Sequence, residues 1–188
     1  HGEPLVSLNN HPKPDYLIDE SEMFFDPAYV TVNEDTFYMN LIIYNIGRAV
    51  DDSVFVRVER KFPDGTLINA FEELVKAPYY KDTLKIPIET SPDQALGINQ
   101  FNVYVDPTDQ PSSIQIDEIE DVVNNQFSVE LIILSDDVLP VFPYEFSIVD
   151  DSGGVELRAS TVNVFSPLRR IVFEVDTTEL FNSSLKQD

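Results

Sequence analysis

The residues of this chain best suited to chemistry are acidic side chains crowded into one predicted loop, residues 106–121, which contains no Lys or Arg. Calcium takes about six to eight oxygen ligands in flexible geometry, so a dense group of carboxylates suits this ion. The acids of the loop are Asp106, Asp109, Asp117, Glu118, Glu120 and Asp121.

A second acidic pair, Asp51 and Asp52, lies in the predicted connection 47–53. In a sandwich of two antiparallel β-sheets this connection and the 106–121 loop can lie at the same pole, where they repel unless a cation or solvent screens them. The alternative is that all these acids are solubilising surface groups, because the chain lacks a D-x-[DN]-x-[DN]-G calcium loop. No cofactor is required, and calcium is the candidate ion. Its predicted ligands are Asp51, Asp52, Asp106, Asp109, Asp117 and Glu118.

The sequence provides no recognisable catalytic centre. It contains no Cys, and its two His, His1 and His11, lie in a polar lead-in. Nucleophilic catalysis needs Ser, Cys or Thr beside a base, and neither His is well placed to be that base. With 34 Asp and Glu in the chain, some carboxylate pair is inevitable, so a glycosidase-like pair carries no signal. We therefore predict that this chain is not an enzyme.

Tyr79 and Tyr80 are a candidate aromatic platform for a sugar ring or a protein partner. Adjacent residues of a strand point to opposite faces of the sheet. The sequence therefore favours one of these two rings in the core.

The elements that must position these residues are predicted to be strands. Apolar residues alternate along the chain, and turn signals such as Phe62-Pro63-Asp64-Gly65 separate the runs. Pro87 lacks an N–H group, which places its strand at a sheet edge. The pattern, without an amphipathic helix, predicts an all-β fold with an immunoglobulin-like β-sandwich. The predicted strands begin near 16–25 and continue at 37–44, 54–59, 67–75, 84–88, 101–105 and 127–133.

The chain is predicted to consist of a flexible lead-in (1–13), the sandwich (14–135) and a second unit (136–188). Strands are predicted at 144–149, 155–162 and 170–176 of the second unit. About 50 residues are too few for a stable independent sandwich. An incomplete sheet exposes unpaired backbone groups at its edge, so we predict self-association through residues 144–176.

Composition excludes some partners. Lys and Arg number 12 against 34 Asp and Glu, for a formal net charge of −22. This charge disfavours nucleic acid and anionic membrane surfaces, and no apolar run approaches the ~18–20 residues needed to cross a bilayer. The absence of Cys fits the cytosol or a large bacterial surface protein. Because the chain begins at His1 without Met, we interpret it as an internal fragment of a longer protein.

Several stretches of the sandwich resemble the cell-adhesion-related (CARDB-type) domain of bacteria, which has an immunoglobulin-like fold. They are residues 14–18, the Asn45-Ile46-Gly47 motif after the second strand, residues 105–107, and the acidic stretch 117–125 that closes on Asn124-Asn125. The resemblance covers roughly residues 14–135. Asn124 and Asn125 are expected to close the loop by pairing with backbone groups.

Residues 139–144, 157–161 and 173–183 resemble the opening half of a fibronectin type III-like repeat. This tandem is similar to regions downstream of the catalytic domain in gingipain-like cysteine peptidases, which Bacteroidetes secrete through the type IX system. The peptidases' Cys–His pair has no matching position here.

The resemblance implies a non-catalytic accessory or spacer module that braces or positions a catalytic domain preceding it. Its partners would be the preceding and following domains of the same polypeptide. Its location would be extracellular or on the outer-membrane surface of a Gram-negative bacterium. The alternative is an adhesin-like module that binds protein or glycan at the cell surface.

Overall fold

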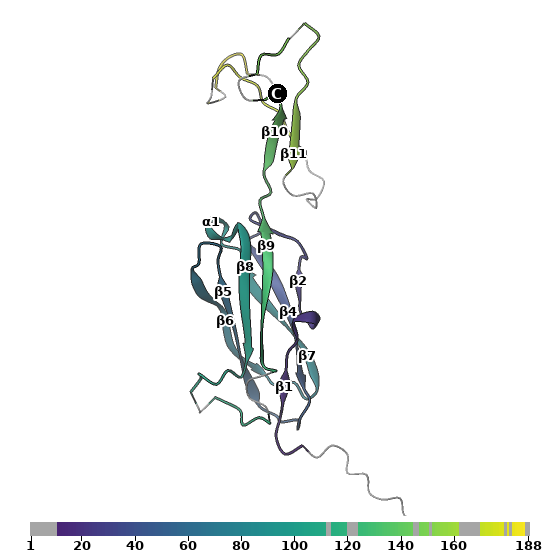
Figure 1. Ribbon diagram of the computed structural model, residues 1–188, viewed down its shortest axis with the longest axis vertical. Helices are drawn as coiled ribbons and strands as arrows, with labels where there is room; N and C mark the ends of the chain where they lie inside the picture. The colour runs from purple at the N-terminus through teal and green to yellow at the C-terminus, as the bar shows by residue number, and fades with distance from the viewer. Residues whose placement is uncertain are drawn as a thin grey trace, which may run out of the picture. The chain divides into compact units, whose positions relative to one another are not determined.

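The computed structural model describes residues 11–111, 114–119, 124–144, 147–150, 152–161, 170–178, 180 and 182–186. Among these residues, regular structure is almost entirely β-strand, with one short 3₁₀ helix, η1 (Glu20–Glu22), and one short α-helix, α1 (Pro92–Ala95). The chain divides into two units, His1–Leu134 and Ser135–Asp188. Figure 1 shows the strands of both units.

The first sheet of unit 1 is built on β4 (Thr36–Asn45). Strand β7 (Lys81–Glu89) pairs antiparallel with β4 along nearly its whole length. Two short strands pair with β4 along its other side, β1 (Tyr16–Leu17) and β2 (Phe24–Asp26). Pro87 therefore lies in an edge strand, as its missing N–H predicted.

The second sheet has the order β3-β9-β8-β5-β6. Its strands are β3 (Val30–Thr31), β5 (Ser53–Lys61), β6 (Leu67–Lys76), β8 (Gly97–Val105) and β9 (Gln126–Leu134). Strand β3 is parallel to β9, and the other pairs are antiparallel. The first part of the chain thus contributes strands to both sheets, which is an immunoglobulin-like arrangement. The predicted all-β, immunoglobulin-like fold class is confirmed.

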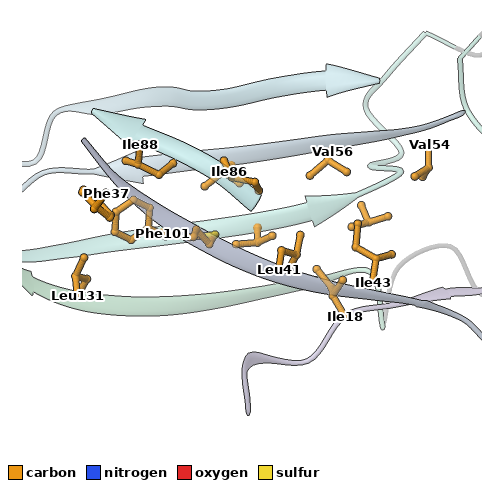
Figure 2. Close-up of a cluster of buried hydrophobic side chains, with 14 of the residues drawn as sticks. Ile18, Phe37, Leu41, Ile43, Val54, Val56, Ile86, Ile88, Phe101 and Leu131 are labelled. Carbon is orange, nitrogen blue, oxygen red and sulfur yellow. The ribbon is translucent and has the colours of Figure 1, made fainter. Parts of the chain in front are cut away.

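The core lies between the two sheets and follows the period-2 pattern of the sequence (Figure 2). Three aromatic rings, Phe25, Phe37 and Phe101, pack edge to face or tilted at centroid distances of 5.5–6.2 Å. Aliphatic side chains complete it, among them Ile18, Leu41, Ile43, Val54, Val56, Ile86, Ile88 and Leu131.

One cation, Arg60 of β5, is fully buried inside this core. Its guanidinium donates to Oδ1 of Asn99 and to the main-chain oxygens of Glu89 and Thr90 at 2.6–3.1 Å. It also lies 4.3 Å from the ring centroid of Phe62. Burial lowers the pKa of Arg60 to about 10. The side chain ties the end of β7 to the opposite sheet.

Of the three strands expected beyond Asp137, the one at 155–162 contains a described strand, and the other two are corrected. Its two described strands are β10 (Val138–Phe142) and β11 (Arg158–Thr161), which pair antiparallel. Described residues of 144–149 form no strand, and in 170–176 only Val175 takes part in a bridge. Strand β10 contains Pro140. Pro is tolerated there because each strand of a two-stranded sheet is an edge strand. The predicted fibronectin type III-like sheet is therefore not supported by the described residues.

No described residue of unit 2 is buried. Large apolar side chains such as Leu139, Tyr144, Ile148 and Val172 are exposed. A lone two-stranded sheet of this kind is only marginally stable in water. Across both units, the described helices are all too short or too polar to cross a membrane.

Candidate functional site at the entry pole

Two acidic side chains of the predicted loop are buried at one end of unit 1. We call this end the entry pole; it holds the start of β1 and the ends of β4 and β8. Asp106, directly after β8, is 2% exposed, and Glu118 is 3% exposed. Their side chains are hydrogen-bonded to each other. A hydrogen bond between two carboxyl groups requires that one of them carries a proton.

The backbone of the loop holds both carboxyl groups in place. Asp106 has a positive φ of 47°, a conformation that Asp tolerates better than most residues. Its N–H donates to the main-chain oxygen of Phe55 at 2.8 Å, and its Oδ2 accepts from the N–H of Ile116 at 2.9 Å. Glu118 accepts from the N–H of Tyr16 at 2.7 Å and from Nδ2 of Asn125 at 2.9 Å.

Burial raises the pKa of Glu118 to about 8. The hydrogen bonds from Tyr16 and Asn125 act in the opposite direction because they stabilise the charged form, while the neighbouring Asp106 raises the pKa further. Burial also raises the pKa of the Tyr16 hydroxyl, with a smaller contribution from nearby carboxylates that include Glu118. Burial and the neighbouring carboxyl group therefore both favour the protonated form of Glu118.

The same loop fastens the segment through which the chain enters unit 1, residues 13–18, which we call the entry segment. Besides the bond from Tyr16 to Glu118, the N–H of Ile18 donates to the main-chain oxygen of Asn124 at 2.9 Å. The N–H of Ile119 donates to the main-chain oxygen of Pro14 at 3.0 Å.

The end of β4 holds the entry segment from the other side. The N–H groups of Ile46 and Arg48 donate to the main-chain oxygens of Asp15 and Lys13, both at 2.8 Å. A Cβ atom on Gly47 would lie 2.5 Å from the oxygen of Lys13. The Asn45-Ile46-Gly47 motif therefore needs glycine at its last position because the entry segment passes directly over it.

The predicted calcium ligands are brought to one pole but not to one point. Asp109 pairs with Nη1 of Arg57 at 2.9 Å, and Asp117 pairs with Nζ of Lys13 at 2.5 Å. Asp51 accepts from the hydroxyl of Tyr79 at 3.0 Å. Asp52 is exposed and accepts from the N–H of Ser53.

Only Asp106 and Glu118 of the six are buried together. In the described part of the chain, no three Asp, Glu or His side chains are grouped as a metal site would require. Glu120 and Asp121 lie outside the described residues. The residue types suit calcium, but the described arrangement does not gather a ligand set, and calcium binding at this pole stays a prediction.

Asn124 and Asn125 close the loop through side chains that donate to carboxyl groups and through main-chain oxygens that accept from backbone N–H groups. Nδ2 of Asn124 donates to Oδ1 of Asp15 at 3.1 Å, and Nδ2 of Asn125 donates to Glu118. Their main-chain oxygens accept from Ile18 and Val105 at 2.9 Å. The pair thus links the loop to both the entry segment and β8.

The expectation that either Tyr79 or Tyr80 lies in the core is wrong. Both rings are exposed, at 55% and 68%. The reason is that β6 ends at Lys76 and β7 begins at Lys81, so the two residues lie in a connection where strand alternation does not apply.

Neither a protein-family model nor a curated protein matches the chain. Among solved structures, the chain is similar to the CARDB domain of a Pyrococcus furiosus protein, whose crystal structure is a complex with di-metal ions. The identity is 19%, the match covers 71% of this chain and 100% of the other, and the TM-score is 0.46. The immunoglobulin-like class of unit 1 rests on its own strand order.

Proposed function

We propose that this chain is a non-catalytic spacer module that holds the polypeptide before it in a fixed position. The observation that carries the proposal is the path of the chain through unit 1. It enters beside Asn45, at the end of β4, and leaves after Leu134, which pairs with Thr31 near the start of β4. Entry and exit are therefore at opposite poles, as Figure 1 shows for β1 and the end of β9.

Both ends of this path are fixed by main-chain hydrogen bonds. The entry segment is bonded to Asn124, Ile119, Ile46 and Arg48. At the exit, the N–H of Val32 donates to the main-chain oxygen of Leu134 at 3.0 Å. A module fixed at both poles keeps a set separation between the segments that it joins. The buried carboxyl pair supports this role because it stabilises the entry rather than lining an open site.

The larger setting that we propose is a secreted or surface-associated bacterial protein, of the gingipain-like peptidase kind exported by the type IX system. It is supported by the sequence resemblance and the acidic composition. In that setting the module lies on the extracellular or outer-membrane surface and braces the catalytic domain of the same polypeptide.

The test is a distance measurement between the two poles. The chain has no native Cys, so spin labels can be attached specifically to Lys13→Cys and to Ile132→Cys, an exposed position near the end of β9. We expect a single narrow distance distribution by pulsed electron paramagnetic resonance. A reference pair on two strands of unit 1, Thr83→Cys and Glu130→Cys, gives the width of a rigid pair. A distribution between the poles much broader than this reference would overturn the spacer proposal.

The second candidate function, an adhesin-like module, is favoured by one observation. Tyr79 and Tyr80 are both exposed at the entry pole, beside charged side chains that can form hydrogen bonds.

A further inference from the structure

The connection between β6 and β7 presents its two tyrosines in a fixed conformation. The N–H of Ala77 donates to the main-chain oxygen of Asp52 at 3.0 Å, and the N–H of Asn45 donates to that of Tyr80 at 2.8 Å. The side chain of Asn45 also donates to the main-chain oxygen of Pro78 at 3.3 Å. A rigid backbone presenting exposed rings loses little conformational entropy when a ligand binds.

Polar groups surround the two rings. The Tyr79 hydroxyl donates to Asp51, and Nζ of Lys76 lies 5.3 Å from the Tyr79 ring centroid. The ring of Tyr80 packs edge to face against Tyr44 at a centroid distance of 6.2 Å. Lys81 lies over the Tyr44 ring and donates to its hydroxyl at 2.6 Å. Exposed aromatic surface thus lies next to both hydrogen-bond donors and acceptors.

The size and chemistry of this surface fit a sugar better than a folded protein. A stable protein interface buries roughly 800 Å² on each partner, far more than two tyrosine rings in a charged surround provide. A sugar ring has a face of C–H groups that packs on the negative face of an aromatic ring. Its hydroxyl groups at the rim need donors and acceptors, which Lys76 and Asp51 supply.

We propose that Tyr79 and Tyr80, with Asp51 and Lys76, form a binding site for one or two rings of a saccharide chain. This proposal deepens the adhesin-like candidate function and is independent of the spacer role. The distance measurement between the poles and the binding experiment below can therefore fail separately.

The test is binding of the full chain to a printed array of neutral and acidic oligosaccharides. The protein is labelled through Ser152→Cys, an exposed position of unit 2. We expect binding to a subset of the glycans, and we expect the Tyr79→Ala/Tyr80→Ala double variant to bind roughly tenfold less, or not at all. Tyr80→Phe keeps the ring and should retain most of the binding.

Tyr29→Ala is the matched control, because Tyr29 is similarly exposed at 53% but lies between β2 and β3. Its binding should equal that of the parent chain. All variants alter exposed side chains, and their unfolding temperatures confirm that they are folded. The proposal is overturned if no glycan binds, or if binding survives the double substitution. A glycoprotein spot that binds equally well after enzymatic deglycosylation would identify a protein ligand instead and would also overturn it.

Discussion

Oε2 of Glu118 accepts a hydrogen bond from the main-chain N–H of Tyr16 at 2.7 Å, although 102 positions of sequence separate the two residues. This contact joins the acidic loop after β8 to the first strand of the sandwich. Because the carboxyl group of Glu118 is also bonded to Asn125 and Asp106, it connects the entry segment to both ends of the loop. The fold thus uses a buried acid to fix the point at which the chain enters.

Removal of this carboxyl group should destabilise unit 1. In Glu118→Ala, the N–H of Tyr16 and the amide of Asn125 lose their buried acceptor, and each such loss costs about 1–3 kcal/mol. We expect a decrease of about 3 kcal/mol in the free energy of unfolding, measured with urea. The free energy of unfolding of Glu118→Gln should decrease much less, because the amide carries no charge and can form hydrogen bonds. One acceptor for it is Oδ1 of Asn125, which has no hydrogen-bond partner in the described structure. Equal losses in the two variants would contradict this role.

The stability of unit 1 should depend on pH through the same residue. Unfolding lowers the pKa of Glu118 from about 8 to its ordinary value of 4.5, so the folded state binds the extra proton between these values. The contribution of this proton to the free energy of unfolding is therefore full below about pH 4.5, and it is lost as the pH rises toward about 8. Repulsion among the 34 acidic residues also lowers the stability as the pH rises. The Glu118→Gln variant keeps this general repulsion and therefore serves as the control for it. The parent chain should lose more stability than Glu118→Gln between pH 5 and 8.5; parallel curves would show that Glu118 does not titrate in this way.

Calcium binding at the entry pole makes a separate prediction. An ion held by the acids of the two loops would raise the unfolding temperature by several degrees at millimolar Ca²⁺ relative to excess chelator. Asp109→Asn and Asp117→Asn should reduce the rise, whereas Asp93→Asn in α1 should not. No rise would leave Asp109 and Asp117 as the ion-pair partners of Arg57 and Lys13.

Self-association through unit 2 is the prediction that concerns partners. The edge of β11 and the exposed apolar side chains of unit 2 favour pairing with another strand. The net charge of −22 opposes contact between copies, so added salt should strengthen it. Sedimentation equilibrium should detect dimers that increase with salt and are weakened by Ala159→Pro, because Ala159 lies within β11. A monomer at all salt concentrations would exclude this contact.

The sandwich could be predicted because its strands obey a period of two. Phe37, Met39 and Leu41 alternate with more polar positions along β4, and Pro87 marks an edge. The shared pole of the two acidic loops followed from the fold class. Which acids would be buried could not be predicted, because Glu118 is distinguished from its neighbours only by contacts with Tyr16, distant in sequence.

Two other features depend on where strands end. Tyr79 and Tyr80 are exposed because β6 stops at Lys76, before Ala77 and Pro78. In unit 2, apolar alternation predicted strands at 144–149, 155–162 and 170–176, and only the second of these contains a described strand, β11. Periodicity identifies segments that can form strands, whereas pairing requires a partner edge and a core. The burial of Arg60 could not be predicted either, because a charged residue in a strand is usually exposed.

Native-state amide hydrogen exchange tests most directly whether the entry segment is an integral part of the sandwich. The N–H groups of Tyr16 and Ile18 donate to Glu118 and Asn124, whereas that of Val103 in β8 belongs to the core sheet. We predict that Tyr16 and Ile18 exchange only through global unfolding, with the same free energy as Val103. Exchange of Tyr16 and Ile18 through a local opening of much lower free energy would contradict the account, because a frayed entry could not hold the preceding chain in position.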